Sequence, residues 1–206
     1  KPLADERAQQ LLPDGGHLSR SPQALVDLML DLLPLRQAFV ARGVEAPRPL
    51  IEAIDRIPPM LRLFRLDDGA LALFNGMGAT APDALATLIA YDDPRGRALT
   101  NAPHSGYQRI EAGPALLVMD CGKPPPPAFS HNAHAGCLSF EFAYARQRLI
   151  INCGAPDVNR EAAREAARAT AAHSTLVMAD VSSCRFAAHT ALRQMFEGQI
   201  LSGPET

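Results

Sequence analysis

The hydrophobic pattern of this chain changes its period once, near the middle, and that change limits the possible folds more than any other feature. In the first half, Leu25, Met29 and Leu32 recur at the 3.6-residue spacing of one helix face. In the second half, short apolar runs alternate with polar residues and are separated by Gly- and Pro-containing turns. The sequence therefore predicts helices over about residues 1–95 and strands over about residues 104–206.

Three helices are predicted in the first half of the chain. The first begins near Pro22, because a serine at the N-cap position followed by a first-turn proline is typical of a helix start. Pro34 removes a backbone donor and predicts a kink or a break in this helix. The other two helices are expected at about residues 49–66 and 81–91. So few helices enclose little core, and we expect them to pack on another part of the protein.

The second half contains the signals of several short antiparallel strands. Residues 106–122 form two β-like runs joined by a Gly-Pro turn and predict a hairpin. Residues 137–144 alternate as a half-buried strand does, and a turn then leads to a more apolar strand. Residues 157–170 fit either a solvent-facing helix or an ordered loop, and residues 174–181 predict a further strand. Short strands joined by turns favour a β-sandwich over a βαβ fold, so the expected class is α+β in more than one domain.

The charge and hydropathy of the chain exclude two classes of partner. The formal charge is −2, the pI is near 6.3, and the 20 basic residues are dispersed, so no surface for nucleic acid is predicted. No stretch is long and apolar enough for a transmembrane segment, and the first residues lack the apolar core of a signal peptide. Because position 1 is lysine, we expect a processed chain or a fragment, which leaves the compartment open.

Two histidines, His131 and His134, lie three residues apart, just before the best-defined strand and after a run of prolines. This spacing fits a binding site, and it fits equally a pair of surface or hydrogen-bonded structural histidines. Zinc takes imidazole nitrogens together with a carboxylate, and further ligands would come from distant residues such as His173. Spacing alone leaves both interpretations open.

The segment DGGHLSRSP, residues 14–22, is the other concentration of polar residues. Its His17 and Arg20 precede a predicted helix N-terminus, an arrangement that favours a carboxylate or sulfate ligand. An alternative is that these residues only form turns and cap the helix. The chain has no Gly-rich phosphate motif and no GxSxG nucleophile elbow, so nothing indicates nucleotide binding or serine-hydrolase chemistry.

The run HNAHAGCLSFEFAYARQRLIINCGAP, residues 131–156, followed by ATAAHSTLV, residues 169–177, resembles the signature of the heparinase II/III-like family of polysaccharide lyases. The resemblance extends to HSGYQRIEAGPALLVMDCG and to the DGGHLSRSP loop, so it covers most of the chain. That family joins an (α/α) toroid to an antiparallel β-sandwich. The resemblance therefore implies that residues 1–95 are the terminal helices of a toroid domain and residues 96–206 an incomplete β-sandwich domain.

By position in the family's motifs, the resemblance implies one structural zinc held by His134, Asn152 and His173, and no organic cofactor. The family has an aspartate where this chain has Asn152, and an amide brings no negative charge to a cation. The family's catalytic histidine falls on Asn132, with His131 one residue away. A plain β-hairpin would keep the three zinc residues apart, so they converge only if the chain bends back before the strand.

The implied reaction is β-elimination on a uronate-containing glycan, which would make the protein a polysaccharide lyase acting on an acidic polysaccharide. His17 is the candidate for stabilising charge on the carboxylate, His131 for proton transfer and Arg20 for substrate binding. The first tyrosine of the chain is Tyr91, so the helical half lacks the family's catalytic tyrosine. The alternative function is a non-catalytic glycan-binding or envelope-assembly protein. A periplasmic or cell-envelope location is expected, with the cytoplasm as the alternative.

Overall fold

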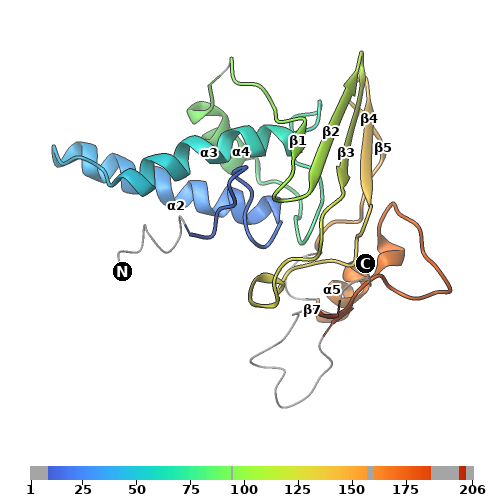
Figure 1. The fold of residues 1–206 in the computed structure, drawn as a ribbon. Helices are drawn as coiled ribbons and strands as arrows, with labels where there is room; N and C mark the ends of the chain where they lie inside the picture. Colours follow the sequence, from blue (N-terminus) through green and yellow to red (C-terminus); the bar gives the residue numbers. More distant parts are fainter. Residues whose placement is uncertain (1–8, 94, 157–159, 187–199, 203–206) are drawn as a thin grey trace.

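The computed structural model describes residues 9–93, 95–156, 160–186 and 200–202, and it shows a helical half beside a sheet half (Figure 1). The sheet half contains a five-stranded sheet and the short helix α5 (Glu161–Arg168). The predicted change from helices to strands is confirmed. The helices of the first half are α2 (Pro22–Ala41), α3 (Arg48–Phe64) and α4 (Pro82–Tyr91).

Helix α2 runs through Pro34, so the predicted break is absent. Pro34 lies on the exposed side of the helix, where the carbonyl group that loses its partner can bond to water. Leu32 and Leu33 beside it are buried, and this packing holds the helix together. Helix α3 likewise continues through Pro58 and Pro59.

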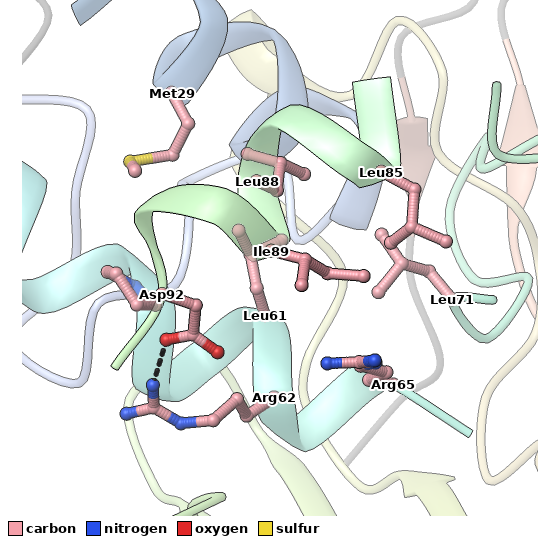
Figure 2. A pocket seen from close by; sticks show the side chains of 10 residues that line it. Met29, Leu61, Arg62, Arg65, Leu71, Leu85, Leu88, Ile89 and Asp92 are labelled. Atoms are coloured by element: carbon pink, nitrogen blue, oxygen red, sulfur yellow. Dashed lines mark hydrogen bonds and ion pairs between the residues drawn. The ribbon is translucent and has the colours of Figure 1, made fainter. Parts of the chain in front are cut away.

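Helix α4 packs against α2 and α3 around a small apolar gap (Figure 2). Leu88 of α4, Leu61 of α3 and Met29 of α2 line the gap, whose volume is about 30 Å³. An ion pair between Arg62 and Asp92 lies at its edge. A gap of this size holds little more than one water molecule, so it is a packing feature and not a ligand site.

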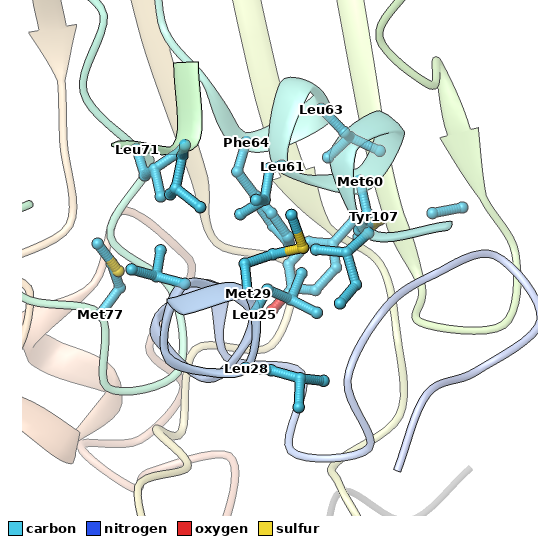
Figure 3. Packing of buried hydrophobic residues seen from close by; sticks show 14 of the residues in the cluster. Leu25, Leu28, Met29, Met60, Leu61, Leu63, Phe64, Leu71, Met77 and Tyr107 are labelled. Atoms are coloured by element: carbon cyan, nitrogen blue, oxygen red, sulfur yellow. The ribbon is translucent and has the colours of Figure 1, made fainter. Parts of the chain in front are cut away.

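One hydrophobic core joins the helices to the sheet (Figure 3). Leu25 and Met29 of α2 and Phe64 of α3 meet Tyr107 of the sheet. The rings of Phe64 and Tyr107 pack edge to face, with their centroids 4.7 Å apart. The expectation that the helices pack on another part of the protein is therefore confirmed.

The strands of the five-stranded sheet are antiparallel and follow chain order. The hairpin predicted over residues 106–122 is confirmed by the second and third strands, which pair from Tyr107 with Asp120 to Ala112 with Ala115. A two-residue turn joins the fourth and fifth strands, and both of its residues have positive φ, as such a turn requires. The strands are β1 (Asn101–Ala102), β2 (Tyr107–Ala112), β3 (Ala115–Asp120), β4 (Phe140–Tyr144) and β5 (Gln147–Ile150).

The sheet has a partly polar face against the helices and an apolar face on the other side. In β4 the buried residues are Glu141 and Ala143, whereas Phe140 and Phe142 are only half-buried. On the other face, four apolar residues of neighbouring strands pair directly with one another and form a row across the sheet: Ile110, Leu117, Phe142 and Ile150. A small second sheet pairs β6 (Arg185–Phe186) with β7 (Ile200–Ser202). The α+β class is thus established.

The segments after β5 correct one prediction and refine another. Helix α5 confirms the helical interpretation for the middle of residues 157–170, of which 157–159 lie outside the described residues. Its Ala167 and Arg168 are buried, so it does not face solvent all round. The strand predicted over residues 174–181 is wrong, because this segment forms only an isolated bridge between Met178 and Val181. Its apolar side chains are exposed and have no neighbouring strand in the described ranges. Among the helices of those ranges, none is long and apolar enough to cross a membrane.

Candidate functional site

A pocket of about 200 Å³ lies where the start of α2, the loop before β4 and helix α5 meet. It contains the sequence-predicted His134 and Asn132, together with two arginines of α5 that the sequence analysis did not single out. Polar groups from segments far apart in sequence converge here, as they do in ligand sites. The lining residues are Gln23, Gly76, Asn132, His134, Ala155, Pro156, Arg164 and Arg168.

A tight turn bends the chain back just before β4. The Ser139 amide donates to the Gly136 carbonyl at 3.0 Å, and Leu138 has a φ of 57°, which is unusual for leucine. The predicted zinc residues can converge only if the chain bends back before this strand, and this turn is such a bend. It places His134 beside His173, although 39 residues separate them in sequence.

Hydrogen bonds from two sides fix the loop that carries His134. On one side, the His134 amide donates to Asn75 Oδ1 at 3.2 Å. On the other side, Arg168 Nε donates to the Ala133 carbonyl at 2.8 Å, and the Ala135 amide donates to the Arg168 carbonyl at 2.8 Å. The end of α5 and the turn at Asn75 therefore hold His134 in place.

Asn75 belongs to a buried polar network that joins the helices to the sheet. Its Nδ2 donates to the Tyr107 hydroxyl oxygen at 2.7 Å, and that hydroxyl donates to the Arg20 carbonyl at 2.7 Å. The Arg20 guanidinium pairs with Asp120 and donates to two backbone carbonyls at 2.7 and 2.8 Å. Burial raises the pKa of Asp120, and Arg20 opposes that shift. All three guanidinium nitrogens of Arg20 thus have partners, so its predicted contact with substrate gains no support.

His17 is held inside the fold and does not line the pocket. Its Nδ1 accepts the Ser19 amide at 3.0 Å, so the proton of the neutral ring is on Nε2, which lies 3.0 Å from Gln10 Oε1. Burial lowers the pKa of His17 to about 4. The role predicted for His17 in charge stabilisation stays a prediction, and its contacts favour a structural role.

The His134 and His173 side chains form a hydrogen-bonded pair. His134 Nδ1 and His173 Nε2 are 3.1 Å apart, and His173 Nδ1 donates to the Ala169 carbonyl at 2.8 Å. The pKa of His134 falls to about 3, mainly because the ring is buried and in addition because His173, Arg168 and Arg164 disfavour positive charge on it. Burial also lowers the pKa of His173. Both imidazoles are therefore neutral at neutral pH.

Arg164 and Arg168 place two cationic groups in the lining of the pocket, and Arg164 Nη1 also lies 4.0 Å from Glu161 Oε2 outside it. The two arginines are four residues apart on α5 and so project from one face of the helix. Arg164 Nη2 donates to Asn132 Oδ1 at 3.2 Å, and the Arg168 guanidinium lies over the Phe186 ring, 4.0 Å from its centroid. Burial lowers the pKa of Arg168 to about 10, so its guanidinium group remains charged at neutral pH. The pocket is suited to an anion.

The residues that the resemblance assigned to zinc fit the metal only in part. Two imidazole nitrogens are close enough together to be ligands of one ion. The Asn152 Oδ1, however, accepts the Ser174 amide at 3.0 Å, and its buried Nδ2 donor has no partner among the described residues. With an amide in place of a carboxylate and two arginines nearby, the donor set does not fit zinc. The zinc site stays a prediction of the resemblance.

The groups that define this site most clearly carry only a weak signal in the sequence. Arg164 and Arg168 lie in a segment whose composition fits either a solvent-facing helix or an ordered loop, and only their spacing of four residues was a signal. Glu141 was placed on a strand without a role, yet its Oε1 accepts the amides of Leu73 and Asn152 at 2.9 and 3.1 Å. His131 is exposed and is not among the residues that line the pocket.

A wider hollow of about 340 Å³ lies on another part of the surface and is also lined by arginines, among them Arg62 and Arg109. Arg62 is paired there with Asp92, and Arg109 with Glu111. Acidic partners are thus present at this hollow as they are beside His134, where Arg164 Nη1 lies 4.0 Å from Glu161 Oε2, and the described residues that line the hollow include no histidine.

The fold and the site define an α+β protein in which a pocket lined by two arginines and a histidine lies at the junction of helices and sheet. The profile of the family described as "Heparinase II/III-like, C-terminal" matches residues 94–204, and the chain belongs to this family. The resemblance seen in the sequence is confirmed, and with it a relationship to polysaccharide lyases.

Known proteins resemble the chain over most of its length. FtsZ-localized protein C of Caulobacter vibrioides (strain NA1000 / CB15N) is 41% identical over 194 residues, which are 90% of this chain and 33% of that protein. A solved heparinase III structure has a TM-score of 0.70 at 16% identity, covering 87% of this chain and 32% of that chain. The heparan sulfate lyase HepC from Pedobacter heparinus has a TM-score of 0.65 at 18% identity, covering 90% and 34%. The chain thus spans about a third of the length of these proteins.

Proposed function

We propose that this protein binds an acidic, uronate-containing glycan, with a carboxylate of the glycan against Arg164 in the pocket beside His134. The observation that carries the proposal is the convergence of two charged guanidinium groups and a neutral imidazole in one pocket. A guanidinium group matches the planar geometry of a carboxylate and binds it with charge-assisted hydrogen bonds. The relationship to polysaccharide lyases supports a glycan as the carrier of that carboxylate.

β-Elimination on the uronate is the second candidate function. Arg164 beside a bound carboxylate would stabilise the charge that develops when the proton α to it is removed, and His134 lies in the same pocket. Two features favour binding without turnover. The low pKa of His134 makes it a weak base at neutral pH, and His17 is occupied by Ser19 and Gln10. The name of the relative from Caulobacter also refers to localisation and not to a lyase.

Replacing Arg164 with alanine tests the proposed binding in the full-length protein. Isothermal titration with uronate oligosaccharides is expected to show affinity roughly tenfold or more weaker for Arg164→Ala than for the wild type, because one charge-assisted contact is lost. Arg36→Ala, a change at an exposed arginine of α2, is the matched control and should bind as the wild type does. Binding that is absent in the wild type, or equal in both variants, would refute the proposal. Release of unsaturated product by the wild type would decide for the lyase.

We propose further that residues 1–95 end an α-helical toroid and that residues 96–206 form part of a β-sandwich. The second face of the sheet supports the sandwich, since the row through Ile110 and Phe142 is apolar and open where a second sheet would pack. The FtsZ-localized relative supports a link to the cell envelope. Limited proteolysis of the full-length protein should therefore cut near residue 95 before it cuts within the strands of the five-stranded sheet.

A further inference from the structure

We propose that His134 and His173 of this protein form a metal-free hydrogen-bonded relay, which directs the Nε2 lone pair of His134 towards a hydroxyl group of the ligand. The relay itself does not depend on what the pocket binds. The assignment of the hydroxyl group rests on the proposed binding of a uronate glycan, and it adds a second contact to the carboxylate contact of Arg164.

The hydrogen bonds of the pair determine which nitrogen of each ring carries the proton. The Ala169 carbonyl can only accept, so His173 Nδ1 must carry a proton, and the neutral ring then has its lone pair on Nε2. That lone pair faces His134 Nδ1, which must therefore be the donor across the 3.1 Å contact. In a neutral His134 the remaining nitrogen, Nε2, is left as an acceptor.

His134 Nε2 is accessible to a ligand. This nitrogen has no hydrogen-bond partner among the described residues. The buried polar atoms without a partner in those residues are Ser139 Oγ, Glu141 Oε2 and Asn152 Nδ2, so Nε2 is not a buried atom. His134 itself lines the pocket with Arg164. The pocket therefore offers an acceptor beside a cation, which is the complement of a hydroxyl group beside a carboxylate.

Three features oppose a cation between the two imidazoles. Arg164 and Arg168 line the same pocket as His134 and place positive charge beside it. Asn152 supplies no negative charge, and the Ser174 amide holds its oxygen. A metal ion would also require the lone pair of His134 Nδ1, and this would move the proton to Nε2. The relay and a metal site thus predict opposite tautomers of His134, while His173 keeps its proton on Nδ1 in both.

The tautomer of His134 is the direct test. Full-length protein with ¹⁵N-labelled histidine, assigned by comparison with His134→Gln and His173→Gln, is expected to show protonated Nδ1 in both rings. Metal analysis after dialysis against zinc should find no stoichiometric zinc. Protonated Nε2 in His134, or one zinc per chain, would overturn the relay. Asn152→Asp restores a carboxylate and should bind zinc roughly tenfold or more tightly than the wild type. Failure to do so would overturn the role given to Asn152.

Ligand binding tests the hydroxyl contact separately. A uronate oligosaccharide should bind the wild type roughly fivefold more tightly than the same oligosaccharide with its uronate hydroxyls O-methylated. His173→Leu, which removes the acceptor for His134 Nδ1, should abolish this preference, and His173→Gln should restore part of it. Equal binding of the two ligands would overturn the contact. If neither ligand binds, the glycan proposal fails and the tautomer result still decides the relay.

Discussion

Replacing Asp120 with alanine is expected to lower the free energy of unfolding by about 3–5 kcal/mol, because it leaves the buried Arg20 guanidinium without its partner charge. The side chains of this ion pair are only 8% and 5% exposed. Arg20 is fixed by two further bonds to backbone carbonyls and cannot turn out to solvent without breaking them. Urea unfolding followed by circular dichroism measures the effect.

The control for this experiment is an ion pair nearer the surface. Asp68 pairs with Arg148, with side chains 33% and 19% exposed, so Asp68→Ala should cost less than about 1 kcal/mol. Because Asp120 is linked through Asn75 to the His134 amide, Asp120→Ala should also weaken glycan binding. Equal losses of stability in the two variants would contradict the structural role of the Arg20–Asp120 pair.

The sequence predicted the parts of the fold that neighbouring residues determine. The period of the α2 leucines, the proline in the first turn of α2, α3 and α4, and the turn in the β2–β3 hairpin are local signals, and these elements formed as expected. The continuous helix at Pro34 could not be predicted in this way, because packing of Leu32 and Leu33 offsets the cost of the proline. Residues 174–181 have the composition of a strand, but they pair with no strand among the described residues.

The candidate site could be predicted only in part, because much of it depends on contacts between segments that are distant in sequence. The resemblance brought His134 and His173 together, and the turn at Leu138 achieves this in the structure. Arg164 and Arg168 could not be assigned to the pocket, because their place depends on how the end of α5 bonds to the loop at Ala133. The buried network of Arg20 could not be predicted either, because its partners lie 85 to 103 residues away in sequence and are brought to it only by the fold.

Acid is expected to destabilise the protein through its buried histidines, of which His17 gives the clearest test. The pKa of His17 falls from an ordinary value near 6.5 to about 4 on folding, so between these pH values the unfolded chain binds a proton that the native chain does not. Its contribution is complete above pH 6.5 and is lost as the pH falls towards 4, by about 3 kcal/mol in total. Folding lowers the pKa of His134 and His173 as well, so they act in the same direction.

Urea unfolding of the wild type and of His17→Gln at a series of pH values between 7 and 4.5 measures this contribution. Glutamine can still bond to Ser19 or Gln10 but does not titrate, so the stability of His17→Gln should fall less steeply with decreasing pH. The comparison uses the slope, so it holds even if the substitution itself lowers stability at pH 7. Identical slopes for the two proteins would mean that His17 gains protons in the native state as readily as in the unfolded chain. The Ser19 and Gln10 contacts would then not exclude water and protons from the ring.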